Sequence, residues 1–230
     1  MPPPCMMEYL MTNSRFFQDL KIPIDDSLEE VVHRLVPGHG GFRDLKKSLD
    51  ARRRHQPTFV YSIEVAEPGQ RLAPMQFHLN ALKASTIPPL IVGSGPAGLF
   101  AALRLVQRGI KPIIFERGSR AEERIKGINR FWRYGALDLR NNVCFGEGGA
   151  GLYSDGKLIT RINSELIPWV MNQLVQFGAP EEIQWLANPH VGSDRLRRVI
   201  PYMRQFLMNK GCQFYFDTQI TELIYSAHQV

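Results

Sequence analysis

The pattern of hydrophobic and polar residues divides the chain into two regions that differ in how their elements follow one another. In the first region, apolar residues recur at helical spacing after Asp26 and Ser27, either of which can cap a helix. The expected elements are a strand over 15–24, a helix over 28–36, a helix over 42–54 and a strand over 58–65. Residues 1–68 are therefore predicted to form a small α+β module.

Strands and helices alternate in the second region, residues 87–230, which follows a linker over 69–86 with a weak apolar pattern. A strand, a helix and a second strand in this order predict a βαβ unit, and hence an α/β fold with a mostly parallel sheet in three layers. The expected strands cover 90–92, 111–116, 212–217 and 220–225. The expected helices cover 97–108, the segment from Asn163 or Ser164 to Gly178, 180–186, and the segment from Ser193 or Asp194 to Gly211. Pro201 is expected to kink the last of these helices.

Composition narrows the class of protein. The chain has 230 residues, of which 44% are hydrophobic and 22% charged, a balance that can bury a core. No apolar run approaches the roughly 18 residues of a membrane span, and the start lacks the pattern of a secretory signal. The three cysteines are far apart, and the six histidines lack metal-ligand spacing, so we expect neither a disulfide framework nor a metal site. A cytoplasmic protein is expected.

The net charge of +6 suits a ligand that carries phosphates, and it would also suit nucleic acid. The densest basic run lies between Lys46 and His55, and it is expected to be the solvated face of a helix. Aromatic residues do not interleave with it as a platform for stacked bases would require. We therefore do not expect nucleic acid to be a partner.

The sequence Gly93-Ser-Gly95-Pro96-Ala97-Gly98 directly follows the strand at 90–92 and begins a helix. In this motif the first glycine permits a tight turn, the second lets the backbone approach a pyrophosphate, and the third lets the helix lie close to the strand. The free N–H groups of the helix N-terminus favour phosphate binding. The pattern predicts a Rossmann-type dinucleotide-binding fold.

The second strand ends at Glu116, 18 residues beyond Gly98, close to the expected offset of about 20. Its carboxylate is expected to accept hydrogen bonds from the adenosine ribose hydroxyls and to disfavour a 2′-phosphate. The structural alternative is a glycine-rich turn that holds no ligand.

A second glycine-rich segment contains five glycines between positions 146 and 156, too many for a helix or strand. Its end, Gly151 to Lys157, matches most of a P-loop pattern, but Leu158 replaces the Ser or Thr that would hold magnesium. We interpret the segment as a second loop along the pyrophosphate and flavin, which favours FAD over NAD.

These motifs are similar to those of a bacterial family described as NAD(FAD)-utilising dehydrogenases. The resemblance lies in VGSGPAGLFAALRL…GIKPIIFERG, RFWRYGALDLRNNVCFGEGGAGLYSDGKLITRI, FGAPEEI, NPHVGSDRLRRVI and, in the first region, KKSLDARRRHQPTFVYSIEV. It implies that the chain is the N-terminal part of a longer FAD-dependent oxidoreductase. NADH or NADPH would be a possible electron donor, and the flavin-binding domain would be incomplete at the C-terminus.

The resemblance and the motifs together give a set of expected cofactor contacts. They are Gly93, Gly95, Pro96, Ala97, Gly98, Glu116, Arg117, Arg124, Gly146, Gly148, Gly149, Ala150 and Gly151.

Four further features have both a functional and a structural interpretation. Lys157 is a candidate cation over the flavin or a surface lysine, and His190 is a candidate partner of Asp194 or an ordinary loop residue. Cys144 is expected to be a small buried residue, and Phe131-Trp132 is expected to lie in the core. Two functions remain open: a flavin-dependent enzyme that transfers hydride through flavin N5 to an unknown substrate, or a truncated, non-catalytic nucleotide-binding module.

Overall fold

The computed structural model describes residues 13–52, 56–74, 77, 82, 87–162, 164 and 166–224. By their contacts the residues form two compact units, each assembled from several stretches of chain. Unit 1 consists of residues 1–78, 158–172 and 180–190, and unit 2 of residues 79–157, 173–179 and 191–230. The expected division into 1–68, 69–86 and 87–230 stays a prediction.

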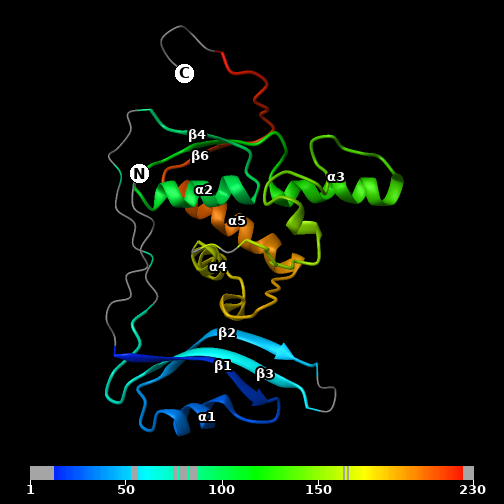
Figure 1. The fold of residues 1–230 in the computed structure, drawn as a ribbon. Coiled ribbons are helices and arrows are strands. Elements are labelled where there is room, and N and C mark those ends of the chain that lie inside the picture. Colours follow the sequence, from blue (N-terminus) through cyan, green and yellow to red (C-terminus); the bar gives the residue numbers. More distant parts are fainter. Residues whose placement is uncertain are drawn as a thin grey trace. The chain divides into compact units, whose positions relative to one another are not determined.

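In unit 1, a three-stranded antiparallel sheet in the order β1-β3-β2 packs against one helix (Figure 1). Its elements are β1 (Ser14–Pro23), α1 (Leu28–Leu35), β2 (Phe42–Asp50) and β3 (Thr58–Ala66). Ser27 caps α1, as predicted, and accepts a hydrogen bond from the backbone N–H of Glu30. Val32 and Val36 pack with Ile63 and Val65 of β3 in the core of the unit.

The helix predicted over 42–54 is wrong, because residues 42–50 form β2. Phe42, Leu45 and Leu49 have helix-like spacing, but a register shift between Asp44 and Lys46 interrupts the regular alternation of a strand. The free edge of β2 pairs with the segment around Leu186, where the Lys47 N–H donates to the carbonyl of Trp185 at 2.7 Å. Of the basic run, Arg52 pairs with Asp50, and residues 53–55 lie outside the described residues.

Unit 2 contains a parallel sheet in the order β4-β5-β6, which confirms the parallel arrangement predicted from the βαβ pattern. The strands are β4 (Leu90–Val92), β5 (Ile113–Phe115) and β6 (Gln213–Tyr215). Read from β6 to β4, this is the strand order 3-2-1 of a mononucleotide-binding half.

The helix α2 (Pro96–Val106) packs against β4, and α5 (Ser193–Asn209) packs against α2, on the same side of the sheet in Figure 1. The helix α3 (Ala121–Tyr134) and the short 3-10 helix η1 (Ala150–Tyr153) contact α5. Ile114 at the centre of the sheet is fully buried, whereas Leu90 and Val92 are 61% and 67% exposed. Alternate residues of a strand face opposite sides of a sheet, and here only the side chains on the face of Ile114 are covered by helices. The described residues therefore do not show the three layers that we predicted.

Several boundaries differ from the prediction. Gly192, not Ser193 or Asp194, precedes α5, which runs unbroken through Pro201. The short helix after Pro180 is the 3-10 helix η2 (Glu181–Gln184), and α4 (Ile167–Gln176) ends before Gly178 as expected. No strand forms over 220–224 in the described residues, and α3 was not predicted at all.

Ile114 provides a test of where the core of unit 2 lies. Replacing Ile114 with alanine should lower the free energy of unfolding by about 2–5 kcal/mol, because it leaves a cavity among buried side chains. The control is Leu90→Ala on the neighbouring strand, which should change it by about 0.5 kcal/mol or less. Urea unfolding followed by circular dichroism measures both values, and equal losses would contradict the one-sided burial of the sheet.

Candidate functional site

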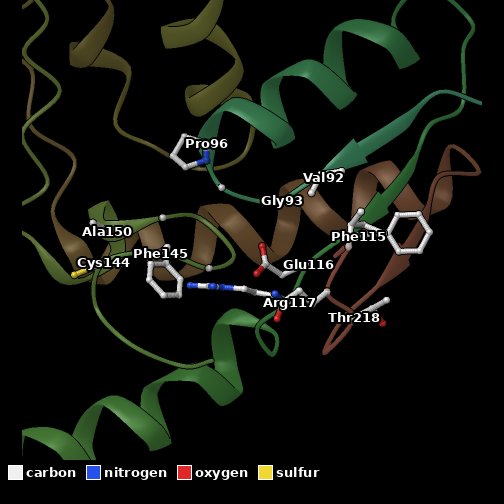
Figure 2. A pocket seen from close by; sticks show the side chains of 15 residues that line it. Val92, Gly93, Pro96, Phe115, Glu116, Arg117, Cys144, Phe145, Ala150 and Thr218 are labelled. Carbon is white, nitrogen blue, oxygen red and sulfur yellow. The ribbon is translucent and has the colours of Figure 1, made fainter. Parts of the chain in front are cut away.

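A pocket of about 590 Å³ opens at the carboxyl ends of β4 and β5 in unit 2 (Figure 2). This is the place where open α/β sheets bind ligands, and the volume is in the range of small-molecule sites. The expected contact residues that line it are Gly93, Gly95, Pro96, Glu116, Arg117, Gly146, Gly149 and Ala150. The glycine motif and the second glycine-rich loop, far apart in sequence, therefore form one pocket.

The other expected contacts are not among the residues that form the pocket wall; they are Ala97, Gly98, Arg124, Gly148 and Gly151. Sequence reasoning missed the lining residues Val92, Phe115, Cys144, Phe145, Thr218, Gln219 and Ile220. Val92 and Phe115 could have been found, since they end the two strands that lead into the site. Residues 218–220 carry no motif and reach the pocket only because β6 lies beside β5.

The glycines of the motif have different reasons for being glycine. A Cβ on Gly98 would lie 2.0 Å from the carbonyl oxygen of Gly93, so packing inside the protein excludes a side chain there. Gly95 has φ −64°, a value open to any residue, and a Cβ on it would come no closer than 3.9 Å to another atom of the chain. Neither the backbone nor packing requires glycine at 95, which leaves the space on its pocket side for a ligand.

Glu116 holds the glycine turn in shape. Its Oε2 accepts hydrogen bonds from the backbone N–H of Ser94 at 2.9 Å and from the Ser94 hydroxyl at 3.0 Å, and its Oε1 accepts from the N–H of Gly118 at 2.8 Å. The side chain is buried yet contributes to the pocket wall. Oε2 thus accepts two hydrogen bonds and Oε1 accepts one, which leaves an acceptor site on Oε1 for a further donor. The carboxylate can therefore serve the turn and a ligand together.

The glycine-rich loop is held from behind by Arg124, whose side chain is fully buried. Its Nε donates to the carbonyl of Asn142, and its Nη1 donates to the carbonyls of Glu147 and Gly149 at 2.8 and 2.9 Å. Burial lowers the pKa of Arg124 from its usual value. The loop is also joined to the first motif, because the Gly148 N–H donates to the carbonyl of Ser94 at 3.0 Å.

Glu147 is the buried acid of this loop, and sequence reasoning missed it. Its Oε2 accepts from the backbone N–H of Ala121, the first residue of α3, at 2.6 Å and from Nη1 of Arg204 at 2.7 Å. Arg204 also bonds to Glu122. Burial raises the pKa of Glu147 to about 7, against the opposing attraction of Arg204. We call Arg124, Glu122, Glu147 and Arg204 the Glu147 cluster.

Arg117 lies across the mouth of the pocket toward Phe145, as Figure 2 shows. The centre of its guanidinium is 3.7 Å from the centre of the Phe145 ring, within the range of a cation–π contact. This pair joins the end of β5 to the glycine-rich loop and adds a positive charge to the pocket wall.

The remaining candidates do not line this pocket. Lys157 is exposed and pairs with Asp155 at 2.7 Å, and His190 is exposed. Asp194 pairs with Arg197 at 3.8 Å. Two expectations of burial are wrong. Cys144 is exposed and lines the pocket, and the exposed fractions of Phe131 and Trp132 are 40% and 55%. The described residues contain no group of three acidic, histidine or cysteine side chains placed to hold a metal ion.

Comparison with known proteins agrees with this geometry. Residues 91–131, which contain the glycine motif and Glu116, match the model of the NAD(P)-binding Rossmann-like domain. This part of the chain is therefore similar in sequence to Rossmann-like NAD(P)-binding domains. Within the described residues, no helix has the length and apolar character needed to cross a membrane.

Two relatives extend the comparison. The chain is 35% identical over 196 residues to an uncharacterized protein of Clostridium beijerinckii, a match that covers 79% of this chain and 37% of that protein. It is 43% identical over 65 residues to the dual trans-enoyl reductase/FAD-dependent monooxygenase tazHJ of Aspergillus terreus, covering 26% of this chain and 9% of that protein. The chain thus spans well under half the length of both relatives.

The raised pKa of Glu147 makes folding stability depend on pH. Between the ordinary value of 4.5 and the folded value of about 7, the folded chain keeps a proton that the unfolded chain has released. Raising the pH through this window therefore removes stability. Glu147→Gln cannot titrate, so from about pH 4.5 to 8 the free energy of unfolding of the parent should fall relative to the variant by about 1–3 kcal/mol.

Urea unfolding at intervals of pH measures this difference. Glu122→Gln is the control, because Arg204 lowers the pKa of Glu122 and its titration lies below the window. If the free energies of unfolding of the parent and of Glu147→Gln differ by the same amount at every pH, the buried carboxyl does not titrate in this window and the prediction is wrong.

Proposed function

We propose that the chain is the FAD-binding part of a flavin-dependent oxidoreductase. The observation that carries the proposal is Gly95, a glycine that no contact inside the protein requires and that faces the pocket at the strand ends. The Rossmann-like match supports a dinucleotide ligand, and the FAD-dependent relative supports a flavin. FAD, when bound, supplies hydride transfer through flavin N5, with NADH or NADPH as the electron donor.

The residues of the pocket fit the ADP half of such a cofactor. Gly93 and Gly95 leave the backbone open to a pyrophosphate, and α2 begins at Pro96 with its free N–H groups on the same side. Glu116 follows β5 beside them, and its Oε1 has an acceptor site for a ribose hydroxyl. Arg117 provides a positive charge, and the loop backbone at Gly146, Gly149 and Ala150 forms the opposite wall.

The absorption spectrum of the purified chain tests the proposal against its alternatives. Flavin bands that NADH or NADPH bleaches support an oxidoreductase. Flavin bands without turnover support the second candidate, a nucleotide-binding module that is not catalytic by itself. This candidate is favoured by the match to the Clostridium beijerinckii protein, which covers only 37% of that protein. Colourless protein that does not take up added FAD would refute both.

Gly95→Ala separates a ligand contact from a packing requirement. The added Cβ fits within the protein but occupies space that a pyrophosphate needs, so FAD affinity should fall at least about tenfold with little loss of stability. Gly151→Ala is the matched control, since its Cβ would lie 4.0 Å from Leu196 and away from the pocket wall. Titration of FAD fluorescence measures affinity; equal affinity in Gly95→Ala and parent would remove the main support for the site.

Glu116→Ala should affect both binding and folding. FAD affinity should fall at least about tenfold, because charge-assisted hydrogen bonds are worth about 1.5–3 kcal/mol each. The structure adds a cost to folding, since the backbone N–H groups of Ser94 and Gly118 lose their acceptor. Glu116→Gln keeps one oxygen, which can accept from the Ser94 donors or from the Gly118 N–H but not from both, so it should recover part of the stability while binding stays weak. Thermal unfolding and FAD titration give the two readouts, and unchanged affinity in Glu116→Ala contradicts the ribose assignment.

A further inference from the structure

Glu147 occupies an unusual place for an acidic residue, inside a loop whose neighbouring residues form the wall of a pocket for an anionic ligand. Gly146 and Gly149 line the pocket on either side of it in sequence, while its own side chain is fully buried. Its Oε1 has no hydrogen-bond partner among the described residues. The carboxyl therefore belongs to the loop that forms part of the pocket wall, and it is shielded from the solvent that would screen its charge.

The charges around Glu147 nearly cancel when it is ionised. Arg204 of α5 and Arg124 of α3 are the cations, and Glu122 of α3 is the other anion of the Glu147 cluster. Arg124 also interacts electrostatically with Tyr153, Glu116 and Cys144. Protonation of Glu147 leaves the cluster with a net positive charge directly behind the loop.

The hydrogen bonds of Glu147 do not require its charge. A neutral carboxyl still accepts from the Ala121 N–H and from Arg204 through Oε2, and Arg124 still holds the loop carbonyls. The shape of the pocket is therefore compatible with both states of the carboxyl, and the states differ in the charge they present to a ligand.

We propose that Glu147 sets the affinity of the pocket for anionic dinucleotides, and that the ligand's pyrophosphate binds with uptake of one proton at the Glu147 carboxyl. This inference rests on the dinucleotide-binding function proposed above. A pKa of about 7 in the free protein supports it, because the proton can then be taken up at physiological pH. The proton comes from solvent, and it neutralises the negative charge of Glu147 in the loop beside the bound pyrophosphate.

The sign of the effect follows from linkage. The bound anion raises the pKa of Glu147 further, so the complex holds a proton that the free protein loses as the pH rises above about 7. FAD affinity should therefore be about threefold to tenfold weaker at about pH 8.5 than at about pH 6.5. The pyrophosphate and the flavin ring do not titrate in this window.

Glu147→Gln distinguishes this role from a structural one, because the two predict opposite changes. At about pH 8.5 the Glu147→Gln variant, with its neutral amide, should bind FAD about threefold to tenfold more tightly than the parent. It should also lack the part of the pH dependence of FAD affinity that comes from titration of Glu147. Glu122→Gln is the matched control: it contacts the same Arg204, and its side chain is 52% exposed. Because the charge of Glu122 helps to raise the pKa of Glu147, this variant should keep the pH dependence of FAD affinity, with an onset at lower pH than in the parent.

The experiment is a titration of FAD into parent, Glu147→Gln and Glu122→Gln across this pH range. Weaker binding by Glu147→Gln, a pH profile shared by all three proteins, or affinity in the parent that rises with pH would each overturn the inference. Flavin binding by the parent that lacks this pH effect leaves the proposed function standing, whereas no binding at any pH refutes both. If Glu147→Gln does not fold, Arg204→Gln removes the cation that lowers the pKa of Glu147, and the loss of affinity should begin at higher pH.

Discussion

The pocket depends on one buried guanidinium. Arg124 donates to the carbonyl oxygens of Asn142, Glu147 and Gly149, and so fixes a loop whose glycines have little intrinsic preference for any conformation. A Cβ on Gly146 would lie 2.9 Å from its Nε, which shows how closely the loop lies against it. Together with the hydrogen bond from the Gly148 N–H to the carbonyl of Ser94, these bonds fix the wall formed by residues 146–150 opposite the first glycine motif.

Carboxylates on both sides of the pocket have the same structural role. Glu116 accepts the N–H groups of Ser94 and Gly118, and Glu147 accepts the N–H of Ala121. In each case an acidic side chain satisfies backbone donors at a turn or at the start of a helix, which would otherwise be buried without partners. The site thus uses negative charge to order backbone that surrounds a pocket suited to an anion, and Arg117, Arg124 and Arg204 offset that charge.

The sequence predicted the parts of the site that follow local rules. The glycine motif, the strand before it and the acid at the end of the next strand are separated by short, regular distances, so their spacing alone indicated a βαβ unit. Phe145 and Glu147 lie in or beside the segment that the glycine content identifies as a loop. The sequence could not predict their contacts, because their side chains pack against Arg117 and Arg204, which are distant in sequence. The helix expected over 42–54 failed for a related reason: pairing with β3 and the segment near Leu186 outweighs the local spacing of apolar residues.

Unit 1 is built from stretches of chain on both sides of the two glycine-rich motifs, and this has a consequence for synthesis on the ribosome. The strands β1, β2 and β3 emerge early, but the segment that pairs with Lys47 on the edge of β2 is made only after the whole of residues 79–157. The backbone groups on that edge of β2 therefore stay unpaired until these later residues have been synthesised. Slow, non-local closure of this kind makes the nascent chain a natural substrate for chaperones, and it means that a fragment ending at residue 157 would lack part of its first unit.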